Sequence, residues 1–171
     1  EGLSCVSSTQ LEILSETDSS CSCTVTASNT SPVCVNDSFN LSALSSSNCT
    51  FQWELSGVDV GGGQDIMNIP SYAPGSFSYV VTATDENGYT CNATTEVQVN
   101  PLPSISAGPD EQVCFGESVV LSASGGVSYN WFEGFQGLNN TTNEITCFVN
   151  NNAAFIVEGE DNNGCLNSDT V

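Results

Sequence analysis

The chain has 171 residues, which is enough for one or two domains of ordinary size. It contains 20 acidic residues and no lysine, arginine or histidine, where average usage predicts roughly 20 basic residues. Nucleic acid and anionic membranes are therefore excluded as partners, because nothing neutralises their phosphates, and catalysis by an imidazole base or a Schiff-base lysine is excluded too.

Alternating apolar residues predict short strands along the chain, and no stretch has a helical period. Residues 1–30 are expected to be the end of a preceding repeat. In residues 31–100, four predicted strands each place their apolar residues on one face: Phe39, Leu41 and Ala43; Phe51, Trp53 and Leu55; Phe77, Tyr79, Val81 and Ala83; Val97 and Val99.

A linker with two prolines, residues 100–103, marks a repeat boundary, because proline cannot donate to a sheet. Residues 101–171 hold the matching strand faces: Val119, Leu121 and Ala123; Val127, Tyr129 and Trp131; Phe155, Val157 and Gly159. Each half contains a cysteine, an alternating strand, a tryptophan, another alternating strand, an Asp-x-Asn-Gly turn and a second cysteine. This order predicts an all-β fold of tandem immunoglobulin-like (PKD-like) β-sandwich repeats, 31–100 and 101–171, with the second truncated at its last strand.

Nine cysteines in a chain without histidine indicate disulfides in an oxidising compartment rather than a zinc site. In each repeat, one cysteine precedes the second strand and another begins the last strand. Because the first strand of such a sandwich runs beside the last, we predict the pairs Cys34–Cys91 and Cys114–Cys165. Cys5 with Cys21 or Cys23 is a further candidate, and Cys49 and Cys147 have no predicted partner.

The run PLPSISAGPDEQVCFGESVVLSASGGVSYNW and the later FIVEGEDNNGC resemble the Ig-like or PKD-like repeats of giant surface proteins from Bacteroidota, including SprB-type gliding adhesins and other type IX-secreted proteins. The resemblance is close over residues 101–171 and good over 31–100. It implies secretion, outer-membrane-associated display at the cell surface, long filaments of tandem repeats, and adhesion or gliding motility, with no catalytic residues. It also implies O-glycosylation at Asp-Ser/Thr-apolar motifs, which names Thr170 and Ser38.

Other candidate sites have weaker signals. Asn92 and Asn140 begin Asn-x-Ser/Thr sequons, the acceptors of N-linked glycans. Residues 85–88 and 161–164 could bind Ca²⁺ weakly, through Asp85, Asn87, Asp161 and Asn163. Asp-x-Asn-Gly is also a common hairpin turn, the interpretation that we favour. Weak Ca²⁺ binding near Asp110 and Glu111 is a further prediction.

The sequence favours a structural role over a catalytic one. Trp53 and Trp131 have aromatic neighbours two residues before them on the same strand, which predicts core positions rather than carbohydrate platforms. Without histidine, the serines and aspartates cannot form a hydrolase triad. We expect no enzyme and no cofactor beyond weakly bound Ca²⁺.

The predicted function is a structural or adhesive repeat segment of a long secreted cell-surface filament. Its expected partners are neighbouring repeats of the same chain and a surface polysaccharide or other cell-surface component. The alternative is a carbohydrate- or Ca²⁺-dependent binding or spacer module appended to a secreted enzyme. A catalytic domain elsewhere in the full chain would favour that alternative, and many more copies of this repeat would favour the filament.

Overall fold

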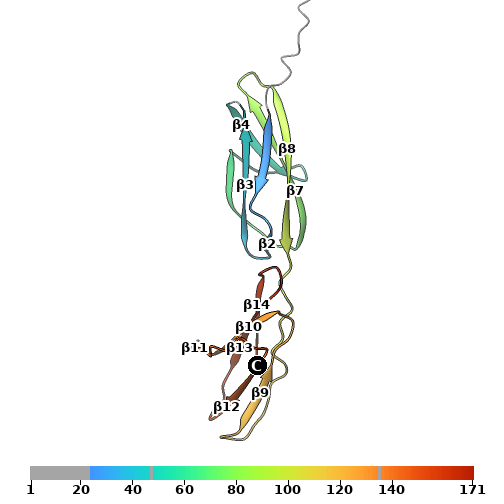
Figure 1. The fold of residues 1–171 in the computed structure, drawn as a ribbon. Coiled ribbons are helices and arrows are strands. Elements are labelled where there is room, and N and C mark those ends of the chain that lie inside the picture. The colour runs from blue at the N-terminus through green and yellow to red at the C-terminus, as the bar shows by residue number, and fades with distance from the viewer. Residues whose placement is uncertain (1–23, 47, 135) are drawn as a thin grey trace, which may run out of the picture.

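The computed structural model describes residues 24–171 except 47 and 135, and it contains two β-sandwiches stacked end to end (Figure 1). All regular elements in the described range are strands, and none is a helix that could cross a membrane. In chain order they are β1 (Val25–Asn29), β2 (Val33–Cys34), β3 (Ser38–Ser45), β4 (Cys49–Leu55), β5 (Val58–Gly62), β6 (Asp65–Pro70), β7 (Gly75–Asp85), β8 (Thr90–Asn100), β9 (Ser118–Ser122), β10 (Ser128–Glu133), β11 (Gln136–Gly137), β12 (Glu144–Phe148), β13 (Phe155–Glu160) and β14 (Leu166–Thr170).

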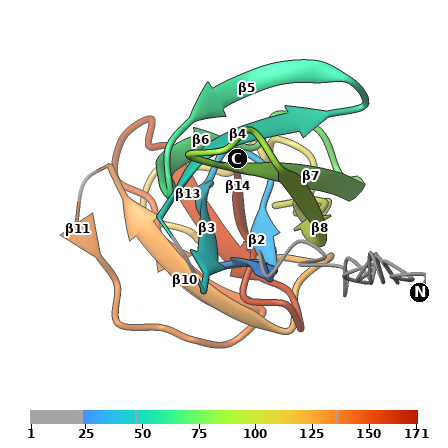
Figure 2. The same ribbon diagram turned by 90° about the horizontal axis from the view of Figure 1, so that it is seen from above.

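The first sandwich packs a three-stranded sheet, β1-β3-β6, against a five-stranded sheet, β2-β8-β7-β4-β5. Viewed end-on, β5, β4 and β7 lie to one side of this sandwich and β3 to the other (Figure 2). The buried residues of β3, β4, β7 and β8 alternate with half-buried or exposed ones, because successive side chains of a strand point to opposite faces. Trp53 lies at the centre of the core with no exposed surface, and its indole Nε1 donates to the Gly63 carbonyl (3.1 Å).

The second sandwich repeats this plan with fewer paired strands. Its sheets are β12-β9 and β11-β10-β13-β14, and an isolated bridge joins Ser106 to Ser124 beside β9. Trp131 is buried opposite Val157, and its Nε1 donates to the Thr142 carbonyl (3.1 Å). Ile145 and Cys147 of β12, which sequence periodicity had not identified, complete the core.

Two details of the expected organisation are wrong. Residues 25–29, assigned above to a preceding repeat, form β1 and pair antiparallel with β3 through Ala27 and Ala43. They therefore belong to the first sandwich; the expectation for residues 1–23 lies outside the described residues. Val127 was placed on the core face with Trp131, but it comes just before β10 and is 61% exposed.

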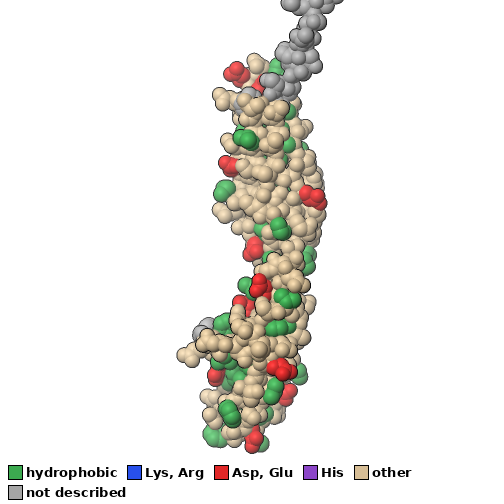
Figure 3. Space-filling view, viewed as in Figure 1, with side chains coloured by type: hydrophobic (Ala, Val, Ile, Leu, Met, Phe, Trp, Pro, Cys, Tyr) green, Lys and Arg blue, Asp and Glu red, His purple; other side chains and the backbone are tan. Residues whose placement is uncertain are grey.

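The surface of the molecule is acidic without being clustered. The face in Figure 3 has red Asp and Glu side chains scattered along both sandwiches, between polar and isolated hydrophobic groups. Since the chain has no lysine, arginine or histidine, hydroxyl and amide groups take the place of basic side chains. One example is the Ser128 hydroxyl, which donates to Glu160 (3.1 Å).

Candidate functional site: the junction between the sandwiches

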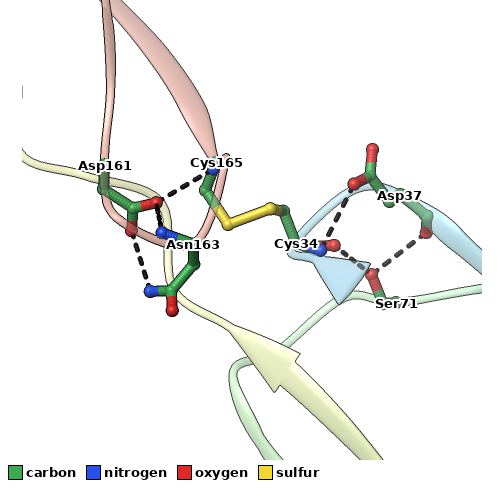
Figure 4. Close-up of a disulfide and its surroundings, with 6 residues drawn as sticks. All are labelled: Cys34, Asp37, Ser71, Asp161, Asn163 and Cys165. Atoms are coloured by element: carbon green, nitrogen blue, oxygen red, sulfur yellow. Dashed lines mark hydrogen bonds between the residues drawn. A yellow bond between two sulfur atoms is a disulfide. The ribbon is translucent and has the colours of Figure 1, made fainter. Parts of the chain in front are cut away.

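A disulfide between Cys34 and Cys165 joins the two sandwiches where they meet (Figure 4). Cys34 is the last residue of β2 in the first sandwich, and Cys165 directly precedes β14 in the second. Their Cα atoms are 5.6 Å apart, a usual separation for a disulfide, although the residues are 131 positions apart in sequence. The two sandwiches therefore have two covalent connections, this bridge and the linker that follows β8.

The predicted pairs Cys34–Cys91 and Cys114–Cys165 are both wrong. The first strand does run beside the last, as expected, but β2 pairs in parallel with the far end of β8, so that Cys34 lies opposite Asn100. Cys91 lies nine residues earlier on β8, which at about 3.3 Å per residue puts it roughly 30 Å away. Cys91 is itself disulfide-bonded, whereas Cys114 is exposed and makes no disulfide within the described part of the chain.

Cys165 and Cys91 also occupy different positions in their hairpins. In the first sandwich the Asp85 amide donates to the Tyr89 carbonyl (2.9 Å), and in the second the Asp161 amide donates to the Cys165 carbonyl (3.0 Å). Cys165 is thus the counterpart of Tyr89, and Cys91 lies two residues further along its strand. The two turns have the same length. What differs is that the cysteine of the second sandwich lies at the end of its hairpin, facing the neighbouring sandwich.

A tight turn presents Cys34 to the junction. The Asp37 amide donates to the Cys34 carbonyl (3.1 Å), and Asn36 has a φ of 73°, as the third position of a type II turn requires. The Asp37 carboxylate accepts from the Cys34 amide (3.2 Å). Buried Ser71 stabilises the turn through its hydroxyl, which donates to the carbonyls of Cys34 (2.7 Å) and Asp37 (3.0 Å).

Asp161 holds the hairpin that carries Cys165. Its Oδ1 accepts from the amides of Cys165 (2.9 Å) and Asn163 (2.8 Å), and its Oδ2 accepts from the Asn163 side-chain amide (3.2 Å). The bond from the Cys165 amide is the main reason why the pKa of Asp161 is lowered, and those from Asn163 add to it. The Asp161 carboxylate thus stabilises the turn that positions the sulfur.

A space of about 240 Å³ lies beside Cys34 at the junction. Its lining is mixed, with Val35, Leu102 and Leu166 as apolar residues and Asn36 and Asp37 as polar ones. The linker is also tied to the second sandwich, because the Asn167 side-chain amide donates to the Pro103 carbonyl (2.8 Å). The disulfide and the tied linker together restrict how the two sandwiches can move at the junction.

The candidate Ca²⁺ ligands lie in two separate turns, one in each sandwich. The Asp85 carboxylate accepts from the amides of Asn87 and Tyr89 (both 2.9 Å), as Asp161 does in the other turn. Among the described residues, no three acidic or cysteine side chains come together as metal ligands. Ca²⁺ binding at Asp85, Asn87, Asp161 and Asn163, or near exposed Asp110 and Glu111, stays a prediction.

The predicted glycan acceptors are mostly on the surface. Ser38, Asn92 and Thr170 are exposed, and Asn140 is half-buried, with its side-chain oxygen accepting from the Thr142 amide (2.8 Å). Modification of these residues stays a prediction. The candidate pair of Cys5 with Cys21 or Cys23 lies outside the described residues.

Sequence reasoning missed the contributions of Ser71 and of the first strand. Ser71 follows β6, a strand that was not predicted. The repeat signal, however, extends further than the segments compared above: Val25-Thr26-Ala27 precedes Ile105-Ser106-Ala107 by the same 80 positions that separate Cys34 from Cys114. That match identifies the start of the first sandwich.

No protein family model matches the sequence, and no curated protein does. Several solved structures are similar to the chain. Fibronectin(III)-like modules of Clostridium thermocellum CbhA are 15% identical, with a TM-score of 0.41 over 85% of this chain and 91% of that one. Three N-terminal domains of the bacteriophage RB49 capsid protein Hoc are 18% identical, with a TM-score of 0.49 over 87% and 58%.

A Ca²⁺-stabilized adhesin with which an Antarctic bacterium binds ice is 17% identical, with a TM-score of 0.44 over 86% of this chain and 47% of that one. The assignment of this chain as two immunoglobulin-like sandwiches in tandem rests on its own strand order and pairing, described above.

Proposed function

We propose that the chain is a stiff, non-catalytic spacer segment of a secreted cell-surface filament that serves adhesion. The observation that carries the proposal is the disulfide across the junction. A disulfide fits an extracellular location, and one that links neighbouring sandwiches holds them in line. A soluble enzyme has no evident need of such a connection, whereas a filament that must project from a surface does.

The high negative charge supports the same function. A net charge of −20 without any basic residue makes neighbouring filaments repel one another and remain soluble. A chain without lysine or arginine also has no cleavage site for trypsin-like proteases. The resemblance to gliding adhesins extends the proposal to gliding motility, with type IX secretion as the export route and glycosylation on the exposed face.

Surface labelling tests the proposal. Antibodies raised against the folded chain should label intact producing cells, and cells whose copy of this segment is deleted should attach less firmly under flow. Deleting an unrelated secreted protein of similar size is the control. Labelling only after the cells are permeabilised would refute the surface location, and unchanged attachment would refute the adhesive role.

A further inference from the structure

We propose that Cys114 is an inter-module disulfide site, which bonds to the hairpin cysteine of a further module of this fold docked at the far end of the second sandwich. The inference rests on the proposed function, because it supposes an array of modules. The expected partner of Cys114 is a sandwich in which a cysteine directly follows the Asp-x-Asn-Gly turn, as Cys165 follows residues 161–164 in this chain.

The first observation is that Cys34 and Cys114 are presented by the same turn. The Glu117 amide donates to the Cys114 carbonyl (3.1 Å), as the Asp37 amide does to that of Cys34. The third residue of the turn has a positive φ in both cases, 73° at Asn36 and 80° at Gly116. Cys114 therefore holds the position from which Cys34 reaches the next sandwich.

The strand pairing around the two turns is equivalent as well. In the first sandwich, Asn36 and Asp37 exchange backbone hydrogen bonds with Ser71 (2.7 and 2.9 Å). In the second sandwich, the residues after Cys114 exchange the same two bonds with Val149 (3.1 and 3.2 Å). The turn of Cys114 is thus built before any partner arrives.

The second observation is an apolar side chain next to Cys114 that nothing in the described chain covers. Val35, which follows Cys34, is half-buried and lines the junction with Leu166 of the second sandwich. Its counterpart Phe115 is 83% exposed. In Figure 3, hydrophobic groups lie at the lower tip of the molecule, the end away from the first sandwich. Val35 packs against the core of its own sandwich, whereas Phe115 has no such cover, and a docked module would bury it.

The third observation is an open groove of about 630 Å³ beside the segment that leads to Cys114, lined in part by Val113, Leu121, Phe155 and Val171. Val171 pairs with Phe155, as Thr95 pairs with Tyr79 in the first sandwich. After Thr95, β8 continues with buried Val97 and Val99 and then pairs with β2. The same continuation after Val171 would fill the groove and lead into the next module, as residues 96–103 do at the existing junction.

The bond forms by thiol oxidation. The thiols of Cys114 and of the incoming cysteine lose two protons and two electrons, and glutathione disulfide accepts them and becomes two molecules of reduced glutathione. A cell-envelope thiol oxidant would take the same role in vivo.

The test extends the 171-residue chain with a copy of residues 96–171 placed directly after Val171, which continues the strand in register. The protein is folded in a glutathione redox buffer, alkylated, digested with a non-tryptic protease and mapped by mass spectrometry. We expect a peptide pair that links Cys114 to Cys165 of the appended copy, beside the Cys34–Cys165 pair of the original junction. In the extended chain with Cys114→Ser, the copy's Cys165 should become a free thiol while the original pair persists.

In the extended chain, alkylation of the original Cys114 in molecules that contain the Cys34–Cys165 pair would overturn the inference and leave the proposed spacer function untouched. A disulfide between the Cys114 residues of two chains would overturn it as well. A second measurement needs no extension: in the folded 171-residue chain, Cys114 should react readily with an alkylating reagent, and failure to react would refute the accessible site that the inference requires.

Discussion

At the residue scale, Cys34 is the residue through which the first sandwich is disulfide-bonded to the second. Cys34→Ser should leave Cys165 without its sulfur partner, because the two are bonded across the junction. Alkylation during unfolding without reductant, followed by peptide mapping, should find one new thiol, at Cys165. Cys91→Ser is the matched control and should leave the Cys34–Cys165 peptide pair intact. A new thiol at Cys91 in the Cys34→Ser chain would instead indicate that Cys34 pairs with Cys91, within the first sandwich.

A substitution at Ser71 tests whether its hydroxyl stabilises the turn that carries Cys34. Its buried hydroxyl is the donor to the carbonyls of Cys34 and Asp37, and alanine would leave those groups without it. Each carbonyl keeps a backbone amide donor, so Ser71→Ala should lower the free energy of unfolding by about 0.5–1.5 kcal/mol, measured by urea denaturation. Exposed Ser78 on β7 is the control, since Ser78→Ala should change stability by less than about 0.5 kcal/mol. Equal effects of the two changes would contradict this role of Ser71.

Asp161 gives the junction a dependence on pH. Amide donors lower the pKa of its carboxyl in the folded chain, so its contribution is complete above the unfolded pKa, about 3.9, and is lost as the pH falls through the folded value. Asp161→Asn should therefore be less stable than the native chain at pH 7, and the difference should shrink toward pH 2. Glu86→Gln, which removes one charge from the exposed turn of the first sandwich, is the control. A difference that does not change with pH would rule out the charge as its cause.

At the scale of secondary-structure elements, one pair of packed positions is filled differently in the two sandwiches. The second sandwich has Gly159 of β13 beside Ile105, and the first has Ala83 and Val25 at the corresponding positions. A methyl group on Gly159 would lie 2.4 Å from Ile105 Cδ1. Gly159→Ala should lower the free energy of unfolding by about 1–3 kcal/mol through overpacking. Adding Ile105→Val, which recreates the pair of the first sandwich, should recover most of that loss. Additive losses in the double variant would show that the two positions are not coupled.

Strand faces were predictable because alternation is local, and the buried sets around Trp53 and Trp131 follow it. The pairing of cysteines was not, since it depends on which end of β8 lies beside β2. Parallel pairing at Asn100 sends Cys34 to the opposite end of the sandwich from Cys91. The hairpin adds a second difficulty: two extra residues after Gly88 move Cys91 along its strand, although both turns share the Asp-x-Asn-Gly pattern. A motif comparison aligns such cysteines, and only the backbone hydrogen bonds distinguish them.

Short or weakly alternating strands were missed for a physical reason. β6 reads Asp-Ile-Met-Asn-Ile-Pro, with exposed residues at four of its six positions, and it is held by pairing with β3 across an irregular register. β12 alternates, but its buried residues are Ile145 and Cys147, and the cysteine suggested a disulfide rather than a core position. Burial raises the pKa of the Cys147 thiol, with a smaller contribution from nearby Glu133, in keeping with a packing role.

At the scale of the whole molecule, the chain stays folded without any basic side chain. Several of the described carboxylates accept hydrogen bonds from amides and hydroxyls. Asp169, for instance, accepts from the Ala107 amide (2.9 Å), which lowers its pKa and ties the strand β14 to the first segment of the second sandwich. The covalent bridge contributes in addition, since closing a loop of 131 residues is worth about 5 kcal/mol in loop-closure entropy.

The bridge also determines how the molecule carries tension. When the chain is pulled from its two ends, the shortest covalent path runs to Cys34, through the disulfide, and on from Cys165. The cores of both sandwiches lie on the loop that this path bypasses. Even if they unfold, that loop adds nothing to the extension.

Single-molecule pulling should therefore show only a short extension of the oxidised chain. Reductant should release a loop of 131 residues, which at about 3.3–3.6 Å per residue is roughly 430–470 Å. The chain with both Cys34→Ser and Cys165→Ser is the control and should extend further than the native chain without any reductant. If the oxidised native chain extended as far as the reduced one, force would pass through the sandwiches, and the disulfide could not be what keeps the spacer intact under load.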